Sequence, residues 1–247
     1  MSETFQPIAI QPPGDNRMLF AVRCLVDLQL LTVFRFLGRE LASCSGRVLD
    51  VGAGQAPWRE LLAHADYVGL DIESAASFGM QRQADIVYYD GVMIPFPDSC
   101  FDHVLCSEVL EHVRDAEAFV SELARVLRVG GTLVLTIPWS ARLHHLPHDY
   151  RRLTRHGLHV LFAAAGFDRI RIEERGNDVA VLANKLIVIT IRLLRPRRKV
   201  RAIWTWPLAA MTAPLALVFL VAAHVALRYG LGSLEDPLGY GLVAVKA

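Results

Sequence analysis

The 247-residue chain has few cysteines and almost no excess of charge, and both scarcities exclude classes of protein. Its four cysteines form no C-x-x-C pair, which argues against a disulfide framework or a zinc ribbon and is typical of a reducing compartment. Lys and Arg number 26 against 25 Asp and Glu, so the bulk charge gives no indication of a nucleic-acid partner. The first fifteen residues lack the basic-then-apolar pattern of a secretory signal, and we expect no such signal.

What the chain has is an ordinary share of apolar residues, 53%, and a length that suits one α/β domain with additions. Between Arg47 and Arg175, short β-rich runs alternate with helical runs. That alternation predicts a doubly wound, mainly parallel sheet. Strands are expected at residues 47–51, 67–70, 86–89, 101–106, 132–137 and 169–173, with a last strand at 238–246.

Capping residues indicate where the helices lie. Asp115 can cap a helix over Asp115–Arg128 that Gly130 and Gly131 stop, and Thr154 can cap another that ends at Gly166. Residues 17–44 are mostly apolar and contain no proline, which predicts one or two helices that cover the sheet. A helix that also touches the ligand or a membrane surface is the alternative.

A glycine-rich turn follows the first predicted strand, in the run RVLDVGAGQAPWRELL (47–62). Gly52 and Gly54 allow a positive φ and a close approach of the backbone to a ligand. A helix after the turn would present unpaired N–H groups to an anion. NAD-binding sheets use a similar turn, but Pro57 stands where their pattern has its third glycine. A ligand without a pyrophosphate is therefore favoured.

Three acidic residues lie at the ends of successive strands: Asp50, Asp71 and Asp90. Ligands of open parallel sheets bind at this edge. Asp71 is placed to accept hydrogen bonds from two ribose hydroxyls, and Asp90 is placed to accept one from an adenine amino group. Each alone could be a strand-end cap, but together the three predict a binding site.

These residues lie within a stretch that resembles a class I S-adenosylmethionine-dependent methyltransferase of the methyltransferase-11 type. The resemblance covers roughly residues 47–175 plus the closing strand. It rests on VLDVGAGQAPW, GLDIE and the run YYDGVMIPFPDSCFDHVLCSEVLEHVRDAEAFVSELARVLRVGGTLVLTIP. It implies S-adenosyl-L-methionine as the cofactor. It also implies an α/β fold, Rossmann-like and doubly wound, with a seven-stranded sheet whose last strand is antiparallel.

The resemblance assigns eight residues to the cofactor: Asp50, Gly52, Gly54, Asp71, Ile72, Asp90, Ser107 and Glu108. The first three would surround the methionine moiety, and Asp71 would hold the ribose. Ile72 would pack against the adenine, and Asp90 would bind the adenine amino group. Ser107 and Glu108 would lie beside the sulfonium. Ala56 and Pro57 depart from the glycine that many members carry in the loop.

Transfer of a methyl group to a hydroxyl also needs a base within hydrogen-bond reach. The loop HHLPHDYRRLT (144–154) holds the candidates. We expect His148 or Asp149 to be the base and Tyr150 and Arg151 to bind the acceptor, unless the loop is only a solvated turn into the next helix.

Two other readings of this region are less favoured. No metal is expected, because no acidic or histidine partner lies at helical spacing from the loop. The pair Glu111–His112, which follows the fourth strand, is interpreted as a helix start rather than as a catalytic pair.

The chain changes character after Asn177, where two apolar stretches, 179–194 and 202–227, flank the basic run 195–201. A single membrane crossing would leave the last strand on the wrong side of the bilayer. Two crossings would put the basic run on the far side, against the positive-inside rule. We therefore expect both stretches to dip into one leaflet, with Trp204 and Trp206 at headgroup depth and the basic run on anionic lipid. A buried helical lid or a dimer interface is the alternative.

The sequence thus predicts three parts. Residues 1–45 form a tail and an N-terminal helical cover, residues 46–177 and 236–247 form the methyltransferase domain, and residues 178–235 form an apolar helical insertion before the last strand. We expect contact with the membrane surface through 179–232, at the cytoplasmic face of the inner membrane, with a peripheral or monotopic chain and no nucleic-acid partner.

Members of the family with "HDYRR" and a late apolar insertion are similar to methyltransferases of bacterial surface-glycan and lipid-linked sugar pathways. The expected reaction is therefore O-methylation of a membrane-borne small-molecule acceptor, a lipid-linked sugar or surface glycan. A prenylated quinone or another lipid is the alternative acceptor. A module that binds S-adenosylmethionine without catalysis is an alternative of another class, and an NAD oxidoreductase is disfavoured by Pro57 and Asp90.

Overall fold

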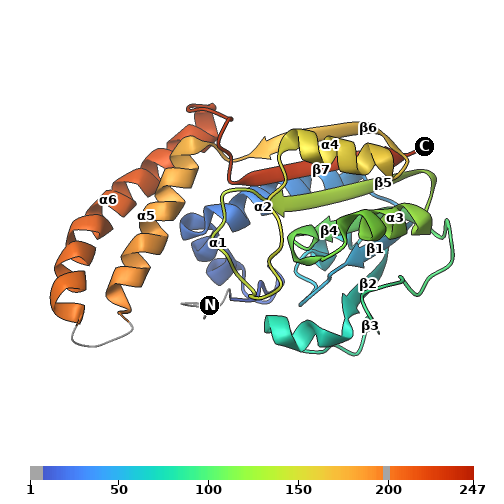
Figure 1. Ribbon diagram of the computed structural model, residues 1–247, viewed down its shortest axis with the longest axis horizontal. Helices are drawn as coiled ribbons and strands as arrows, with labels where there is room; N and C mark the ends of the chain where they lie inside the picture. Colours follow the sequence, from blue (N-terminus) through green and yellow to red (C-terminus); the bar gives the residue numbers. More distant parts are fainter. Residues whose placement is uncertain (1–7, 197–200) are drawn as a thin grey trace.

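The computed structural model describes residues 8–196 and 201–247, and its central feature is a sheet of seven strands (Figure 1). The strands are β1 (Arg47–Val51), β2 (Asp66–Ile72), β3 (Ile86–Tyr89), β4 (Phe101–Ser107), β5 (Leu127–Pro138), β6 (Phe167–Arg175) and β7 (Gly239–Lys246). Their order across the sheet is β3-β2-β1-β4-β5-β7-β6. The first five strands pair in parallel, and β7 lies antiparallel between β5 and β6. The predicted fold class, with its antiparallel last strand, is confirmed.

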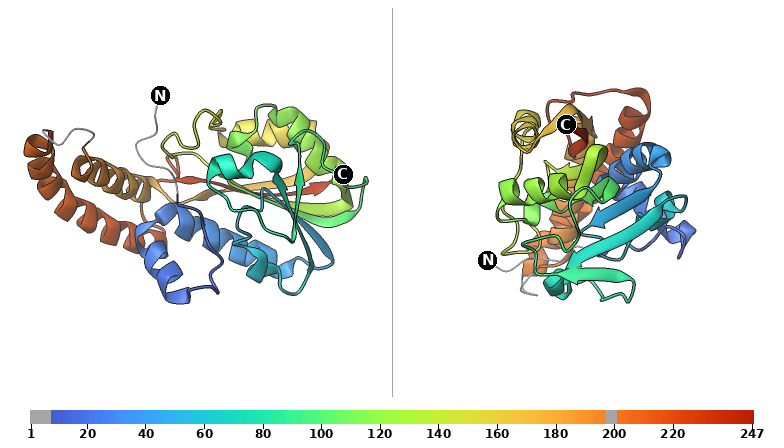
Figure 2. Two further views of the ribbon diagram at one scale, coloured as in Figure 1. Left: turned by 90° about the horizontal axis from the view of Figure 1, so that it is seen from below. Right: turned by 90° about the vertical axis from the view of Figure 1, so that its right-hand side faces the viewer.

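The helices cover both faces of this sheet and also extend beyond it. They are α1 (Arg17–Val26), α2 (Leu28–Glu40), α3 (Ala116–Val126), α4 (Arg155–Ala164), α5 (Asp178–Leu194) and α6 (Ala202–Tyr229). Alternate side chains of a strand point to opposite faces. In β4, Leu105 packs in one core with α2, and Val104 and Cys106 pack in another core with α3 and α4. Figure 2 (right) shows α2 on one side of the sheet and α3 and α4 on the other.

The N-terminal segment forms two helices, as expected. Asn16 caps α1 by accepting a hydrogen bond from the Leu19 N–H. Asp27 follows the last residue of α1 and caps α2 through the Leu30 N–H at 3.1 Å. Helix α2 packs on the sheet, while α1 keeps an exposed apolar face, which includes Met18 and Val22.

Two predictions about helices are wrong in detail. The glycine-rich turn leads into only one turn of 3₁₀ helix, η2 (Arg59–Leu62), because β2 already begins at Asp66, whose N–H donates to Gly46. Helix α3 ends at Val126 rather than at Arg128, since Leu127 pairs with Phe101 in the sheet.

Helices α5 and α6 form an antiparallel hairpin that projects from the sheet (Figures 1 and 2). Ala209, Ala216 and Ala223, seven residues apart, are buried on one side of α6. The hydroxyls of Thr190 in α5 and Thr212 in α6 are 2.9 Å apart, which places this side of α6 against α5. The hairpin therefore depends on small side chains that let the two helices approach closely.

The rest of α6 is exposed. Within the described part of the chain, α6 alone is long and apolar enough to cross a membrane, with a mean hydropathy of 2.1 over a stretch of which 17% is buried. The ends of α5 and α6 that carry Arg195 and Arg201 lie farthest from the sheet. Of the basic run 195–201, residues 197–200 lie outside the described residues.

Candidate functional site

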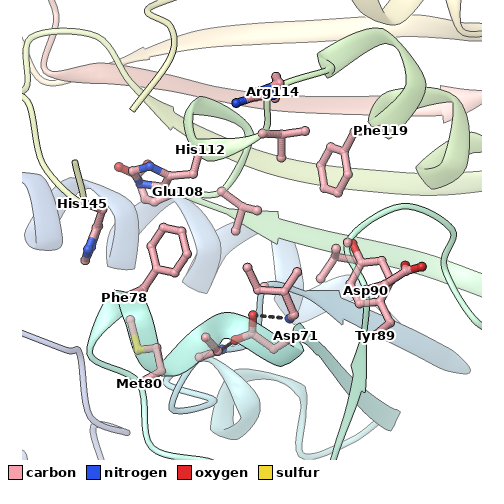
Figure 3. Close-up of a pocket in the computed structure, with 18 residues that line it drawn as sticks. Asp71, Phe78, Met80, Tyr89, Asp90, Glu108, His112, Arg114, Phe119 and His145 are labelled. Carbon is pink, nitrogen blue, oxygen red and sulfur yellow. Dashed lines mark hydrogen bonds between the residues drawn. The ribbon is translucent and has the colours of Figure 1, made fainter. Parts of the chain in front are cut away.

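A cleft at the carboxyl ends of β1, β2 and β4 consists of two adjoining cavities of about 270 and 260 Å³. The residues that line both cavities are Gly52, Gly54, Met80, Glu108, His112 and His145. Figure 3 shows the first cavity, with Asp71, Asp90 and Tyr89 toward one end and Phe78, His112 and His145 toward the other. The second cavity lies between the glycine-rich loop that follows β1 and the N-terminal segment with α2.

The glycine-rich loop forms the floor of the cleft. Gly52 has φ of 77°, and a Cβ there would lie 2.3 Å from Cγ2 of Val109, so any other residue would be strained and would have to displace Val109. Gly54 has φ of 56°, and its N–H donates to Oδ2 of Asp71 at 2.8 Å. The positive φ expected at both glycines is present, and it ties the loop to the end of β2.

Asp71 is the polar centre of the first cavity. Its other carboxylate oxygen, Oδ1, accepts a hydrogen bond from the Ile72 N–H at 2.7 Å. Burial raises the pKa of Asp71, while the two backbone N–H groups act in the opposite direction. The carboxylate is therefore held in place at the cavity wall.

Most of the predicted cofactor residues meet in this cleft. Gly52, Gly54, Asp71, Ile72, Asp90 and Glu108 line the first cavity. Ser107 lines the second, where its hydroxyl is 2.9 Å from that of Thr136. Asp90 closes a tight turn by accepting the Val92 N–H at 2.9 Å.

Asp50 is the exception, because it lines neither cavity. It is 1% exposed and accepts a hydrogen bond from the Tyr67 hydroxyl at 2.8 Å. Burial raises the pKa of Asp50 to about 7. Its side chain is thus held inside the fold, and its role beside the methionine moiety stays a prediction.

Glu108 has a partner that the sequence did not reveal. Arg175, the last residue of β6, is 3% exposed and donates to Oε1 of Glu108 at 2.7 Å. Glu108 itself has φ of 56°, so the chain turns sharply after β4. The predicted strand ended at residue 173, two residues before Arg175, and the partner of Arg175 lies 67 residues away in the chain.

The predicted base and acceptor residues do not line the cleft. His148 is exposed, with its Nδ1 3.1 Å from the Tyr150 hydroxyl, and Arg151 donates to the carbonyl of Arg114. Asp149, whose side chain is 0% exposed, makes a two-point ion pair with Arg152 at 2.6 and 2.9 Å. Burial by itself would raise the pKa of Asp149, but the Arg152 hydrogen bonds bring it below its ordinary value.

These contacts make Asp149 a positioning residue for its loop and a poor base. Its Oδ2 also accepts the N–H of His144 at 3.0 Å, and His144 and His145 are the residues of this loop that reach the cleft. His148, Asp149, Tyr150 and Arg151 thus lie outside both cavities, and their assignment to catalysis and acceptor binding stays a prediction.

The pair Glu111–His112 is more than a helix start. It lies in the 3₁₀ turn η4 (Leu110–His112), where Oε1 of Glu111 is 3.6 Å from Nε2 of His112 and 3.9 Å from Nε2 of His144. Burial raises the pKa of Glu111 well above its ordinary value and lowers the pKa of His112 to about 4. Helical spacing missed this cluster because its members come from two different loops.

The comparisons with known proteins agree with the geometry of the cleft. Residues 49–135 match the Methyltransf_11 family, described as a methyltransferase domain. A probable S-adenosylmethionine-dependent methyltransferase of Mycolicibacterium smegmatis is 35% identical over 101 residues, which are 38% of this chain and 39% of that protein.

Two further relatives carry more specific names. A fatty-acid O-methyltransferase of Mycolicibacterium smegmatis is 34% identical over 143 residues, 53% of this chain and 51% of that protein. A demethylmenaquinone methyltransferase of Mycobacterium sp. strain KMS is 39% identical over 109 residues, 41% of this chain and 47% of that protein. The chain thus spans between 39% and 51% of the length of these three curated relatives.

Solved structures confirm the fold over nearly the whole chain. An S-adenosylmethionine-dependent methyltransferase from Archaeoglobus fulgidus has a TM-score of 0.54 at 18% identity, covering 94% of this chain and 100% of that one. The cyclase SpnF has a TM-score of 0.52 at 17% identity, covering 99% of each chain. Because one neighbour is a cyclase, the fold alone does not determine the reaction. The family match and the cleft together support a methyltransferase domain with S-adenosyl-L-methionine as its cofactor.

Proposed function

We propose, from the methyltransferase domain at residues 49–135, that the chain transfers a methyl group from S-adenosylmethionine to an acceptor carried in a membrane. One combination of features carries this proposal. The cleft at the sheet edge has residues suited to a nucleoside, and the same molecule has a largely exposed apolar helix, α6.

The cleft suits the cofactor in shape and charge. Asp71 would accept from the ribose hydroxyls, Ile72 would pack on the adenine, and Asp90 would accept from the adenine amino group. Glu108, which lines both cavities, would place a negative charge near the sulfonium. Arg175 holds that carboxylate in position.

The reaction depends mainly on the alignment of the acceptor oxygen, the methyl carbon and the sulfur. When bound, S-adenosylmethionine supplies an electrophilic methyl group. A bond forms between the acceptor oxygen and the methyl carbon while the carbon–sulfur bond breaks, its electron pair stays on sulfur, and the acceptor proton leaves to solvent. The residues of the glycine-rich loop and of η4 would hold both reactants in line, which would lower the entropic part of the barrier.

Membrane contact is supported by two helices. On α6, Trp204 is 76% exposed and Met211 73%, and on α1, Met18 is 78% exposed. His224 of α6 bonds to the Leu25 carbonyl of α1 at 2.8 Å, which joins the two helices, and Figure 2 (left) shows α1 beside the inner end of α6. Burying this surface, which includes Trp204 and Trp206, in one leaflet would stabilise attachment.

Both ends of the hairpin return to the sheet, α5 from β6 and α6 toward β7. That arrangement suits a hairpin that docks from one side, so we propose a peripheral or monotopic chain at the cytoplasmic face of the inner membrane. A lid or a dimer interface would bury the same side chains without lipid.

A lipid is the acceptor class that the relatives support best, because two of them are named for a fatty acid and for demethylmenaquinone. A sugar linked to a lipid, as the sequence predicts, would be presented at the same surface. Both acceptors require the cleft to approach the bilayer.

The test incubates the full chain with bacterial envelope and radiolabelled S-adenosylmethionine and then separates lipid from polysaccharide. Label in the lipid fraction is expected, and label in polysaccharide would identify a glycan instead. Cofactor binding with no label in any fraction would overturn the proposal in favour of a non-catalytic module.

The matched variants are Asp71→Ala and Asp66→Ala, at opposite ends of β2. Asp71→Ala removes charged hydrogen bonds to the ribose and should weaken cofactor binding about 10- to 100-fold in calorimetry. Asp66 has an exposed side chain and should leave binding unchanged. Equal affinities of the two variants would contradict the assignment of Asp71.

A further inference from the structure

We propose that Glu111, His112 and His144 form a binding site for a divalent metal ion of the zinc type in the wall of the cleft. Glu111 and His112 lie in η4, after β4, and His144 lies in the loop after β5. One ligand atom from each of these residues lies within 4.8 Å of the others. Nothing in the sequence or in the comparisons assigns a metal to them.

The Glu111 carboxylate is the first argument. It is 0% exposed, and neither of its oxygens has a hydrogen-bond partner among the residues that the structure describes. A buried carboxyl group without a partner is costly, and such groups in proteins are normally paired or coordinate a metal. A cation between Glu111 and the two imidazoles would satisfy these oxygens.

The orientation of the two histidines is the second argument. Nδ1 of His112 is 2.7 Å from the carbonyl oxygen of His148, and Nδ1 of His144 is 3.0 Å from that of Arg142. A nitrogen facing a carbonyl must donate, so in the neutral rings both Nε2 atoms carry a lone pair, and both lie toward Glu111. Metal-binding histidines typically donate their other N–H to a carbonyl in this way.

The distances fit a small ion. Nε2 of His112 and Nε2 of His144 lie 3.6 and 3.9 Å from Oε1 of Glu111. Ligands about 2.0 Å from a tetrahedral zinc are about 3.3 Å apart, so small side-chain movements would close the site. Two imidazoles and one carboxylate are the protein ligands of many catalytic zinc sites, which keep a fourth position open.

The role of the ion rests on the proposed function. His112 lines both cavities, so the open position would face their junction. An acceptor hydroxyl bound there would have a lowered pKa, so its proton would pass to solvent water before the oxygen attacks the methyl carbon. This would supply the activation that Asp149, paired with Arg152, does not provide.

The test measures zinc directly. The full chain, stripped with a chelator, is titrated with zinc in equilibrium dialysis, and the expected result is one ion per chain. His112→Ala, His144→Ala and Glu111→Gln should each weaken zinc binding by at least about 10- to 100-fold. His156→Ala, which changes an exposed histidine on α4, is the control and should bind zinc as the unaltered chain does.

Circular dichroism of each variant shows whether it is folded, and Glu111→Gln keeps the shape of the side chain. No bound zinc in the unaltered chain, or equal zinc affinity in folded His112→Ala, His144→Ala and His156→Ala, would overturn the proposal. Calorimetry of S-adenosylmethionine on the zinc-free chain separates this outcome from a failure of the proposed function, since cofactor binding would persist without the metal.

Discussion

Two aspartates on neighbouring strands show how the surroundings of a single residue decide its role. Asp71 is held by two backbone N–H groups at the cavity wall, and Asp50 is enclosed against Tyr67. Desolvation disfavours a charge at both sites. Only at Asp71, which lines the cavity, can hydrogen bonds to a bound ligand offset this free-energy cost. Asp50 therefore affects stability, and its effect depends on pH.

We expect Asp50→Asn to change the pH dependence of folding. Burial raises the pKa of Asp50 from 3.8 to about 7, so the folded chain binds a proton that the unfolded chain has released. The contribution of Asp50 to stability is therefore greatest below its unfolded pKa and is lost as the pH rises toward 7. As the pH rises from about 5 to about 8, the free energy of unfolding of Asp50→Asn should increase by about 2 to 3 kcal/mol relative to that of the unaltered chain. Urea unfolding measures this difference.

The control for this measurement is Asp66→Asn, whose side chain is 71% exposed. It should follow the pH dependence of the unaltered chain. If the free energy of unfolding of Asp50→Asn depends on pH as that of the control does, Asp50 is ionised in the folded chain at little cost in free energy. That result would contradict the prediction.

At the scale of elements, the hairpin of α5 and α6 depends on where α6 carries small residues. Ala209 is 1% exposed on the side that faces α5, and its neighbour Ala210 is exposed. Ala209→Leu should push the helices apart and cost about 1 to 3 kcal/mol, whereas Ala210→Leu should be close to neutral. Amide hydrogen exchange of α5 measures the difference, and equal protection in both variants would contradict this packing.

At the scale of the whole molecule, the exposed apolar surface of α6 should determine where the protein is found. Trp204 and Trp206 are 76% and 59% exposed. Changing both to Ser should weaken flotation with vesicles that contain phosphatidylglycerol by at least about 10-fold, because each indole buries a large apolar area. High salt should weaken it further through Arg195 and Arg201.

The matched control changes Val129 and Val160, which are 71% and 69% exposed but lie on β5 and α4. This variant should float with vesicles as the unaltered chain does. If all three proteins remain in solution, or the unaltered chain is a dimer that buries α6, the surface serves a protein contact and the membrane proposal is wrong.

Much of the fold was predictable because its signals are local. The strands were found from apolar runs, the starts of α3 and α4 from Asp115 and Thr154, and the turn at Gly52 from the need for a positive φ. Each signal depends on a few consecutive residues, so the amino-acid order alone contains it. Six of the predicted cofactor residues line the first cavity for the same reason, since they follow directly from the strand ends.

The order of residues by itself therefore determined the sheet, its cofactor edge and the apolar character of α6. Only the tertiary structure decided that Asp50 points inward, that Arg175 reaches Glu108, and that His144 meets Glu111. The reason is physical: burial and pairing depend on contacts between segments that are far apart in the chain. A local pattern of apolar and polar residues does not indicate which distant side chain will pack against it.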